Sequence, residues 1–181
     1  MIKVDLTTER LYLNNIREED CNQTYLSWLM DMEVNKYMES RFYSHSIESI
    51  KNFVKEQSEH AVYAAIRIKV TNKHIGNIKI GRLNKNHKTG EYGIMMGDRL
   101  EWGKGYAKEA SIAIINHCFS EVGLNKVLLG VIDNNTVAYQ LYLKLGFVVE
   151  GVLKENFYDP DEKSYRDEIR MAVFKKDWKY Q

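Results

Sequence analysis

Glu101-Trp102-Gly103-Lys104-Gly105-Tyr106-Ala107 connects a predicted strand (91–96) to a predicted helix (105–121). Glycines in such a turn let the backbone approach a ligand, and the helix start presents unpaired N–H groups that can bind an anion. Neither common phosphate motif fits: a P-loop needs Ser or Thr where Gly105 stands, and a dinucleotide fingerprint needs a small residue where Lys108 stands. Taken alone, this turn is either an anion-binding loop or a connection that only packs.

The rest of the chain alternates between the period of strands and the period of helices. The pattern predicts strands at residues 10–14, 61–70, 74–83, 91–96, 127–132, 147–153 and 164–174. It predicts helices at residues 18–30, from 47 onward, at 105–121 and between Asn135 and Gly146. Helical crossovers favour parallel strand pairs and tight loops favour antiparallel ones, so this order predicts a mixed α/β sheet of about seven strands flanked by four helices. We expect one domain that covers residues 1–181.

The composition argues against several classes of protein. The 181 residues carry 26 Lys and Arg against 25 Asp and Glu, and this net charge of +1 disfavours a general nucleic-acid binder. No apolar run reaches the roughly 18 residues of a membrane span, and residues 1–5 lack the apolar region of a signal peptide. Cys21 and Cys118 are too few and too far apart for a zinc site or a disulfide framework, so we expect buried thiols in a cytoplasmic protein. The five histidines show no metal-ligand spacing, so no metal is expected.

A second informative stretch lies about thirty residues after the glycine turn, at residues 134–147. Asn135, Ala138 and Tyr142 are spaced three and four apart, so on a helix they share one face. A separate apolar stripe is predicted to hold this helix against the sheet; it consists of Val137, Leu141 and Leu145. Tyr142 alone is open to two interpretations, a packing tyrosine or a functional phenol.

Together, Trp102-Gly103-Lys104-Gly105-Tyr106-Ala107 and Asn135…Ala138…Tyr142-x-Lys144-x-Gly146-Phe147 resemble the GNAT superfamily of acetyl-coenzyme-A-dependent N-acetyltransferases. Residues 146–151 and the opening Thr8-Glu9-Arg10-Leu11-x-Leu13 are similar to the branch that contains ribosomal-protein N-terminal acetyltransferases and spermidine acetyltransferases. The resemblance covers nearly the whole chain and implies a GNAT-like fold, in which splayed parallel strands form the acetyl-CoA cleft. It departs from the usual motif at Trp102, where the family commonly has Gln or Arg that contacts phosphate.

The resemblance implies that acetyl-CoA is the co-substrate and assigns residues to each part of it. Besides Trp102, the turn residues that would meet its diphosphate are Gly103, Lys104, Gly105, Tyr106 and Ala107. The pantetheine arm would pair like an extra strand with Ile94, Met95 and Met96, and a backbone N–H near Met95 or Met96 would stabilise the developing oxyanion. Asn135 would bond the arm from the other side, and Ala138 would leave it room. Lys104 and Lys144 either meet a phosphate or are ordinary surface lysines.

Proton transfer is assigned to Tyr142 and Glu91. By position in the family motif, Tyr142 is the acid that protonates the departing thiolate. Glu91, at the start of the strand that leads to the acetyl group, is the candidate base that removes a proton from the amine, directly or through a water. A solvated carboxylate at a strand end is an equally good interpretation of Glu91.

In this family the acceptor site is built from the segment after the first helix and from the last hairpin, here residues 37–45 and 155–165. The candidate acceptor-binding residues are Tyr37, Arg41, Tyr43, Glu155 and Tyr158. Arg41 suits an anionic amino-sugar nucleotide, whereas the acidic residues of these segments suit a polyamine or a protein amino terminus.

The sequence therefore predicts an N-acetyltransferase that acts on a primary amine, and it leaves the acceptor open. The alternative is a non-catalytic acetyl-CoA sensor or interaction domain. We expect neither nucleic-acid nor membrane binding, and the formation of a homodimer stays an open question.

Overall fold

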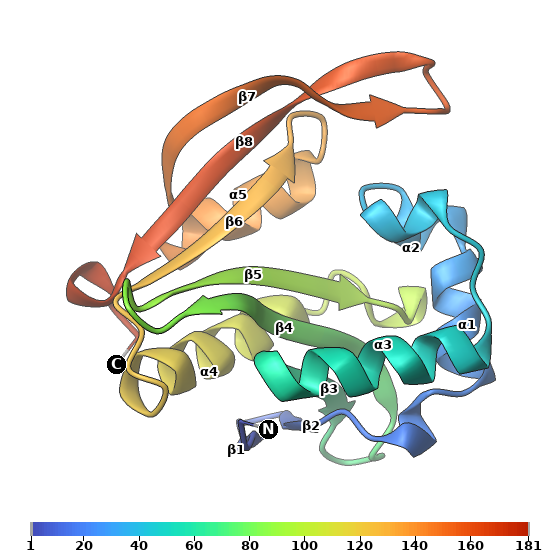
Figure 1. Cartoon of the computed structure of the whole chain (residues 1–181). Coiled ribbons are helices and arrows are strands. Elements are labelled where there is room, and N and C mark those ends of the chain that lie inside the picture. The colour runs from blue at the N-terminus through green and yellow to red at the C-terminus, as the bar shows by residue number, and fades with distance from the viewer. Residues whose placement is uncertain (1, 181) are drawn as a thin grey trace.

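The computed structural model describes residues 2–180 and contains one sheet of eight strands in the order β1-β2-β3-β4-β5-β6-β8-β7. The strands are β1 (Asp5–Thr7), β2 (Leu11–Asn15), β3 (Val62–Ile68), β4 (His74–Asn84), β5 (Thr89–Met96), β6 (Lys126–Ile132), β7 (Val148–Asp159) and β8 (Ser164–Phe174). Neighbouring strands are antiparallel except β5 and β6, which are parallel. The predicted mixed sheet is thus confirmed, as Figure 1 shows.

Five α-helices join the strands: α1 (Gln23–Met30), α2 (Met32–Asn35), α3 (Ile47–His60), α4 (Tyr106–Ser120) and α5 (Thr136–Leu145). Local signals explain their ends. The Ser46 hydroxyl accepts from the Ser49 N–H at the start of α3, and Gly146 ends α5 with a left-handed φ of 93°. None of the helices within residues 2–180 is long and apolar enough to cross a membrane.

The sheet is covered on both faces. One cluster of buried side chains joins the sheet to α4 and α5 through residues such as Ile114 and Leu145. The other joins it to α1 and α3 through residues such as Trp28 and Ile50. Side chains alternate along β5 between these two clusters, so this strand contributes to both layers. Both cysteines are free and buried, as predicted.

The structure differs from the sequence prediction near the amino terminus. The helix predicted over residues 18–30 is a single 3₁₀ turn at Glu18–Asp20 followed by α1, because the Asn22 side chain accepts from the N–H groups of Thr24 and Tyr25 and starts a new helix there. The short strand β1 and the one-turn helix α2 were not predicted.

The apolar stripe predicted on α5 is wrong at one end. Val137 is 83% exposed, and the helix packs through Ala138, Tyr142 and Leu145 instead. Eight residues advance a helix by about 80° beyond two full turns, so Val137 and Leu145 cannot share one narrow face. The buried face of α5 therefore coincides with the face that the sequence assigned to ligand binding.

Candidate active site

The strands β5 and β6 separate after a short paired region. They pair in register only at Thr89–Lys126, Gly90–Val127 and Glu91–Leu128, although β5 continues to Met96. Figure 1 shows the two strands starting together and then diverging toward α2 and the tip of the β7–β8 hairpin. Beyond Glu91, the edge of β5 that faces β6 has no strand partner within the described residues. This splay leaves backbone groups available to a ligand that can pair like a strand.

The glycine turn lies between the end of β5 and the start of α4. Gly103 and Gly105 both have left-handed backbone conformations, with φ of 75° and 81°, which glycine adopts without strain. Gly105 precedes the first residue of α4 and supplies no side-chain cap, so the N–H groups of the first turn are available to a ligand. The Trp102 indole donates to the Met96 carbonyl oxygen at 2.8 Å. Trp102 therefore fixes the turn to the end of β5, and this explains the residue type that departs from the family motif.

The turn is supported from the amino-terminal strands. Arg10 donates to the Lys104 carbonyl oxygen at 2.9 Å and forms a 2.7 Å ion pair with Glu109 on α4. The Glu109 carboxylate also accepts from the Thr8 hydroxyl at 2.6 Å and from the Arg10 N–H at 2.8 Å. Burial opposes ionisation of Glu109, but the hydrogen bonds from Thr8 and Arg10 outweigh it and lower its pKa. Thr8 and Arg10 thus hold the turn in place, a role that no local sequence pattern indicates.

The two candidate phosphate-binding lysines differ in their surroundings. The Lys104 ammonium lies 2.7 Å from the Glu101 carboxylate, so an existing ion pair engages it. Lys144 is exposed near the end of α5, where its carbonyl oxygen accepts from the Tyr180 hydroxyl. The backbone amides of the turn are therefore better placed to bind a phosphate than either side chain.

Tyr142 lies on α5, which follows the diverging strand β6. Its ring is 8% exposed and packs edge-on against Tyr92 of β5, with ring centroids 5.7 Å apart, and against Phe147 at 5.8 Å. Burial raises the pKa of Tyr142 to about 12, so the phenol is protonated at neutral pH. No hydrogen bond between residues 2–180 involves its hydroxyl, whereas the Tyr92 hydroxyl pairs with Ser111 at 2.7 Å. The Tyr142 phenol can therefore donate to a ligand.

Asn135 and Ala138 lie one turn apart on the same helix. The Asn135 side chain accepts from the Ala138 N–H at 3.3 Å and so caps α5. The predicted contact of Asn135 with a pantetheine arm would have to use its side-chain NH2 group or the second lone pair of its side-chain oxygen. Ala138 is half-buried beside the aromatic cluster, and its small side chain adds little bulk there.

Glu91 is the last residue of β5 that pairs with β6. Its carboxylate oxygens receive Arg82 at 2.8 Å and Arg170 at 2.9 Å, so it is not a solvated strand end. Successive strand residues point to opposite faces, which places the side chains of Glu91 and Tyr92 on different sides of the sheet. The structure therefore does not bring Glu91 and Tyr142 into contact, and an amine could reach the Glu91 carboxylate only through a water or by displacing an arginine.

The two predicted acceptor segments contact each other. Arg41, with a side chain only 7% exposed, donates to the Lys36 carbonyl oxygen at 2.7 Å and pairs with Asp161 of the β7–β8 turn at 2.8 Å. Phe42 packs against Phe157 with ring centroids 5.9 Å apart. Arg41 thus joins the α2 region to the hairpin, and its guanidinium group is already engaged.

The other candidate acceptor residues are scattered. Tyr37 donates to the Asn134 carbonyl oxygen at 3.3 Å, next to the start of α5. Tyr43 is 64% exposed, and Tyr158 packs on Tyr165 along the hairpin. Glu155 has a positive φ of 52°, and its N–H donates to Asp167. No hydrogen bond, ion pair or ring contact within residues 2–180 joins these four side chains to one another, and their role in acceptor binding stays a prediction.

Comparison with known proteins identifies the family. A family model described as an acetyltransferase (GNAT) domain matches residues 10–148. The chain belongs to the GNAT family. An uncharacterized N-acetyltransferase of Bacillus subtilis, YoaA, is 30% identical over 159 residues, which cover 84% of this chain and 88% of that protein. The spermidine N(1)-acetyltransferase of Escherichia coli K12 is 33% identical over 99 residues, or 55% of this chain and 52% of that protein.

The fold comparison agrees with the sequence comparison. The crystal structure of the Vibrio cholerae spermidine N-acetyltransferase in complex with CoA and spermine superimposes with a TM-score of 0.83 and 21% identity, over 94% of this chain and 98% of that chain. The predicted GNAT-like fold is therefore confirmed. This GNAT protein is an N-acetyltransferase, and the residues that carry out the transfer remain predictions.

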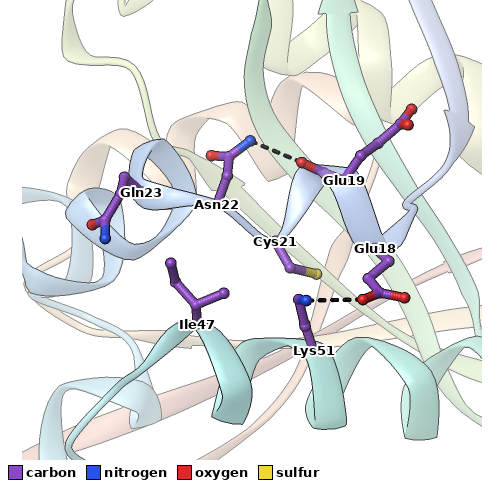
Figure 2. Close-up of a pocket in the computed structure, with 7 residues that line it drawn as sticks. All are labelled: Glu18, Glu19, Cys21, Asn22, Gln23, Ile47 and Lys51. Atoms are coloured by element: carbon purple, nitrogen blue, oxygen red, sulfur yellow. Dashed lines mark hydrogen bonds and ion pairs between the residues drawn. The ribbon is translucent and has the colours of Figure 1, made fainter.

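Two surface pockets of this GNAT fold can be compared with the predicted site. One, of about 460 Å³, lies between the 3₁₀ turn at Glu18–Asp20 and the start of α3. Figure 2 shows Cys21 among the residues that line it, next to the ion pair of Lys51 with Glu18, which measures 2.8 Å. This pocket contains none of the predicted site residues. The other, of about 400 Å³, includes Glu91 and Gly93 and so adjoins the splay.

The described part of the GNAT chain contains no group of three or more His, Cys, Asp or Glu side chains arranged to hold a metal ion.

Proposed function

We propose that this chain transfers the acetyl group of acetyl-CoA to a primary amine by direct attack within a ternary complex. The observation that supports this most is the splay of β5 from β6, bordered at one end by the glycine turn and along one side by Tyr142. A thioester held along the free edge of β5 would lie between a protonated phenol and an open backbone edge. This arrangement provides positioning and proton donation in one place.

The residues of the turn fit a diphosphate. Gly103 and Gly105 are exposed, and the space where a side chain would project from Gly103 is empty to 4 Å. The Lys104 N–H belongs to the turn itself, and the N–H groups of Tyr106 and Ala107 begin the first turn of α4, where the helix dipole favours negative charge. Bound acetyl-CoA would supply an activated acetyl thioester, and this chain would fix its position.

The pantetheine arm would pair with β5 at Ile94, Met95 and Met96. These residues lie beyond the last β5–β6 pair, so their edge is open to an added strand. A backbone N–H of Met95 or Met96 would then stabilise the oxyanion that develops during attack, an interaction worth about 2.7–4 kcal/mol in related reactions.

In the reaction, a bond forms between the amine nitrogen and the acetyl carbon, and the bond from that carbon to sulfur breaks. The amine must first lose a proton, since an alkylamine with a pKa near ~10 is mostly protonated at neutral pH. We assign that proton to a water next to Glu91, because two arginines occupy the carboxylate itself. As the tetrahedral intermediate collapses, its nitrogen loses a second proton to water, and the Tyr142 phenol gives its proton to the departing thiolate and regains one from solvent.

We also propose that the described sheet forms one functional domain and that the protein is cytoplasmic. All eight strands belong to a single sheet. Two buried thiols that are not joined to each other fit a reducing compartment.

An acceptor screen tests the proposal. Purified protein is mixed with acetyl-CoA and a panel of amino sugars, polyamines, amino acids and peptides, and free thiol is measured over time. We expect thiol release that depends on both protein and acceptor, together with a rise in melting temperature when CoA is added. CoA-dependent stabilisation without thiol release for any acceptor would favour the acetyl-CoA sensor instead.

A further inference from the structure

The 400 Å³ pocket beside the splay has open space above Gly93 of β5. It opens where β5 leaves β6, since Glu91 is the last paired residue and Gly93 follows two positions later on the same face. No atom lies within 4 Å of the position that a side chain at Gly93 would occupy. A molecule in this pocket could therefore reach the β5 backbone next to the proposed thioester position.

Lys79 forms the wall of this pocket. It stands opposite Gly93 in the β4–β5 register, and its aliphatic chain leans over Gly81 instead, which keeps the space above Gly93 open. The Lys79 ammonium donates to the Gln57 side-chain oxygen at 3.0 Å and lies 5.1 Å from the centre of the Phe53 ring. These neutral contacts hold the ammonium in place at the side of the pocket.

Lys79 has no ion-pair partner. It is half-buried, and no carboxylate of residues 2–180 lies within ion-pair distance of its ammonium. Burial lowers its pKa and repulsion from Arg82 adds to this effect, whereas attraction to Glu91 and Glu56, both beyond ion-pair distance, opposes it. An anion bound in the pocket would remove this unfavourable burial of charge.

The carboxylate that lines the pocket is, in contrast, already paired. Glu91 receives two arginines, and one of these, Arg170, also holds Glu168 at 2.7 Å. A polyamine acceptor carries several positive charges and needs free carboxylates to offset their desolvation. The pocket offers the opposite, one unpaired cation.

We propose that the acceptor is a small primary amine that carries an anionic group, a carboxylate or a phosphate, and that Lys79 binds this anion while the amine lies over Gly93. This inference rests on the proposed function, because the amine must lie beside a thioester bound along β5. It departs from the acceptor named for the spermidine acetyltransferase relatives.

Matched acceptors test this inference in the full chain. β-Alanine and propylamine differ by a carboxylate, and glucosamine 6-phosphate and glucosamine differ by a phosphate; spermidine represents the polyamines. We expect kcat/KM to be at least about tenfold higher for the anionic member of at least one pair, the scale of one charged hydrogen bond. A preference within the β-alanine and propylamine pair would identify a carboxylate as the bound anion, and a preference within the glucosamine pair would identify a phosphate.

Variants assign the preference to Lys79. Lys79→Met keeps an unbranched side chain and should reduce the anionic preference at least about fivefold, mainly through KM, whereas Lys79→Arg should keep it. Lys55→Met, on the exposed side of α3, is the control and should also keep it.

Three results would overturn the inference while leaving the proposed function intact: equal rates within both pairs, spermidine as the best acceptor, or an unchanged preference in Lys79→Met. Absence of thiol release with every acceptor would contradict the proposed function itself.

Discussion

Replacing Tyr142 by phenylalanine removes the one hydroxyl that the proposed mechanism uses. The ring contacts with Tyr92 and Phe147 remain, and the lost hydroxyl has no hydrogen-bond partner within residues 2–180. We therefore expect Tyr142→Phe to change the free energy of unfolding by less than about 1 kcal/mol, which corresponds to less than about 4 °C in Tm. Binding of CoA should change little, because the diphosphate contacts lie on the glycine turn.

The expected loss is in the chemical step. A positioned acid typically contributes a factor of about 10²–10⁴ in rate. A thiolate with a pKa near ~8.5 leaves without much help, which places the effect at or below the lower end of that range. We expect kcat to fall by at least about tenfold and at most about a hundredfold, equivalent to about 1.4–2.7 kcal/mol in the activation barrier. The assay is thiol release at saturating acceptor, with an acceptor for which chemistry limits the rate.

The pH profile gives an independent check. With a pKa of about 12, Tyr142 stays protonated through the neutral and moderately alkaline range, so its ionisation should cause no loss of kcat below about pH 10. An unchanged kcat in Tyr142→Phe would refute the assignment and leave the phenol a packing group. An alkaline loss centred near pH 8 that disappears in this variant would also refute the reasoning, since it would require a far more acidic phenol.

Three further changes test the turn and its supports. Gly105→Val forces a branched residue into a φ of 81°, which should cost about 1–3 kcal/mol of stability and abolish stabilisation by CoA. The control Gly123→Val, at a φ of 76° outside the turn, should cost similar stability but keep CoA binding. Equal CoA binding by both variants would show that the turn only packs. Glu109→Gln should cost about 1–3 kcal/mol in urea unfolding at pH 7, since the carboxylate accepts three hydrogen bonds. Because the folded-state pKa of Glu109 is lowered, its contribution to stability is present above about pH 4.3 and is lost as the pH falls through the folded-state pKa. The Glu109→Gln variant should therefore lose less stability than wild type on acidification. Parallel profiles of stability against pH for the two proteins would contradict this. Gly97→Ala would drive a methyl group into the Trp28 ring and should lower stability by about 1–3 kcal/mol, and an unchanged urea midpoint would show that the ring moves aside freely.

Much of the fold could be predicted because local chemistry marks its elements. Alternating side chains identify β2 at residues 11–15, and Gly146 marks the end of α5. The helix predicted over residues 18–30 was wrong because two effects compete within that segment. Residues 18–30 have helical periodicity, but the Asn22 side chain competes for the backbone N–H groups and divides the segment.

In the candidate site, too, some features could be predicted from the sequence and others could not. The glycine turn could be recognised from seven consecutive residues, because its function depends on backbone that only glycine allows. Its supports could not, since Arg10 and Glu109 are 99 residues apart and neither is unusual in its own segment. The prediction of an anion site at Arg41 depended on the arginine being unpaired. Only the fold shows that Asp161, 120 residues further along the chain, already pairs with it.

Charge pairing also decides how far a relative's substrate can be carried over to this chain. The cofactor side of a GNAT fold depends on backbone geometry, which chains of 21% identity share with a TM-score of 0.83. The acceptor side depends on which charges remain unpaired once the fold has formed, and this can change without any change in the fold. Here arginines from β4 and β8 engage Glu91 beside the splay, while Lys79 lacks an ion-pair partner within residues 2–180. A count of acidic residues in the acceptor segments would indicate a polyamine. Of the three charged side chains that line the 400 Å³ pocket, however, Arg82 and Glu91 pair with each other and Lys79 keeps an unpaired positive charge. This unpaired positive charge therefore favours an anionic amine as acceptor, even though relatives are named spermidine acetyltransferases.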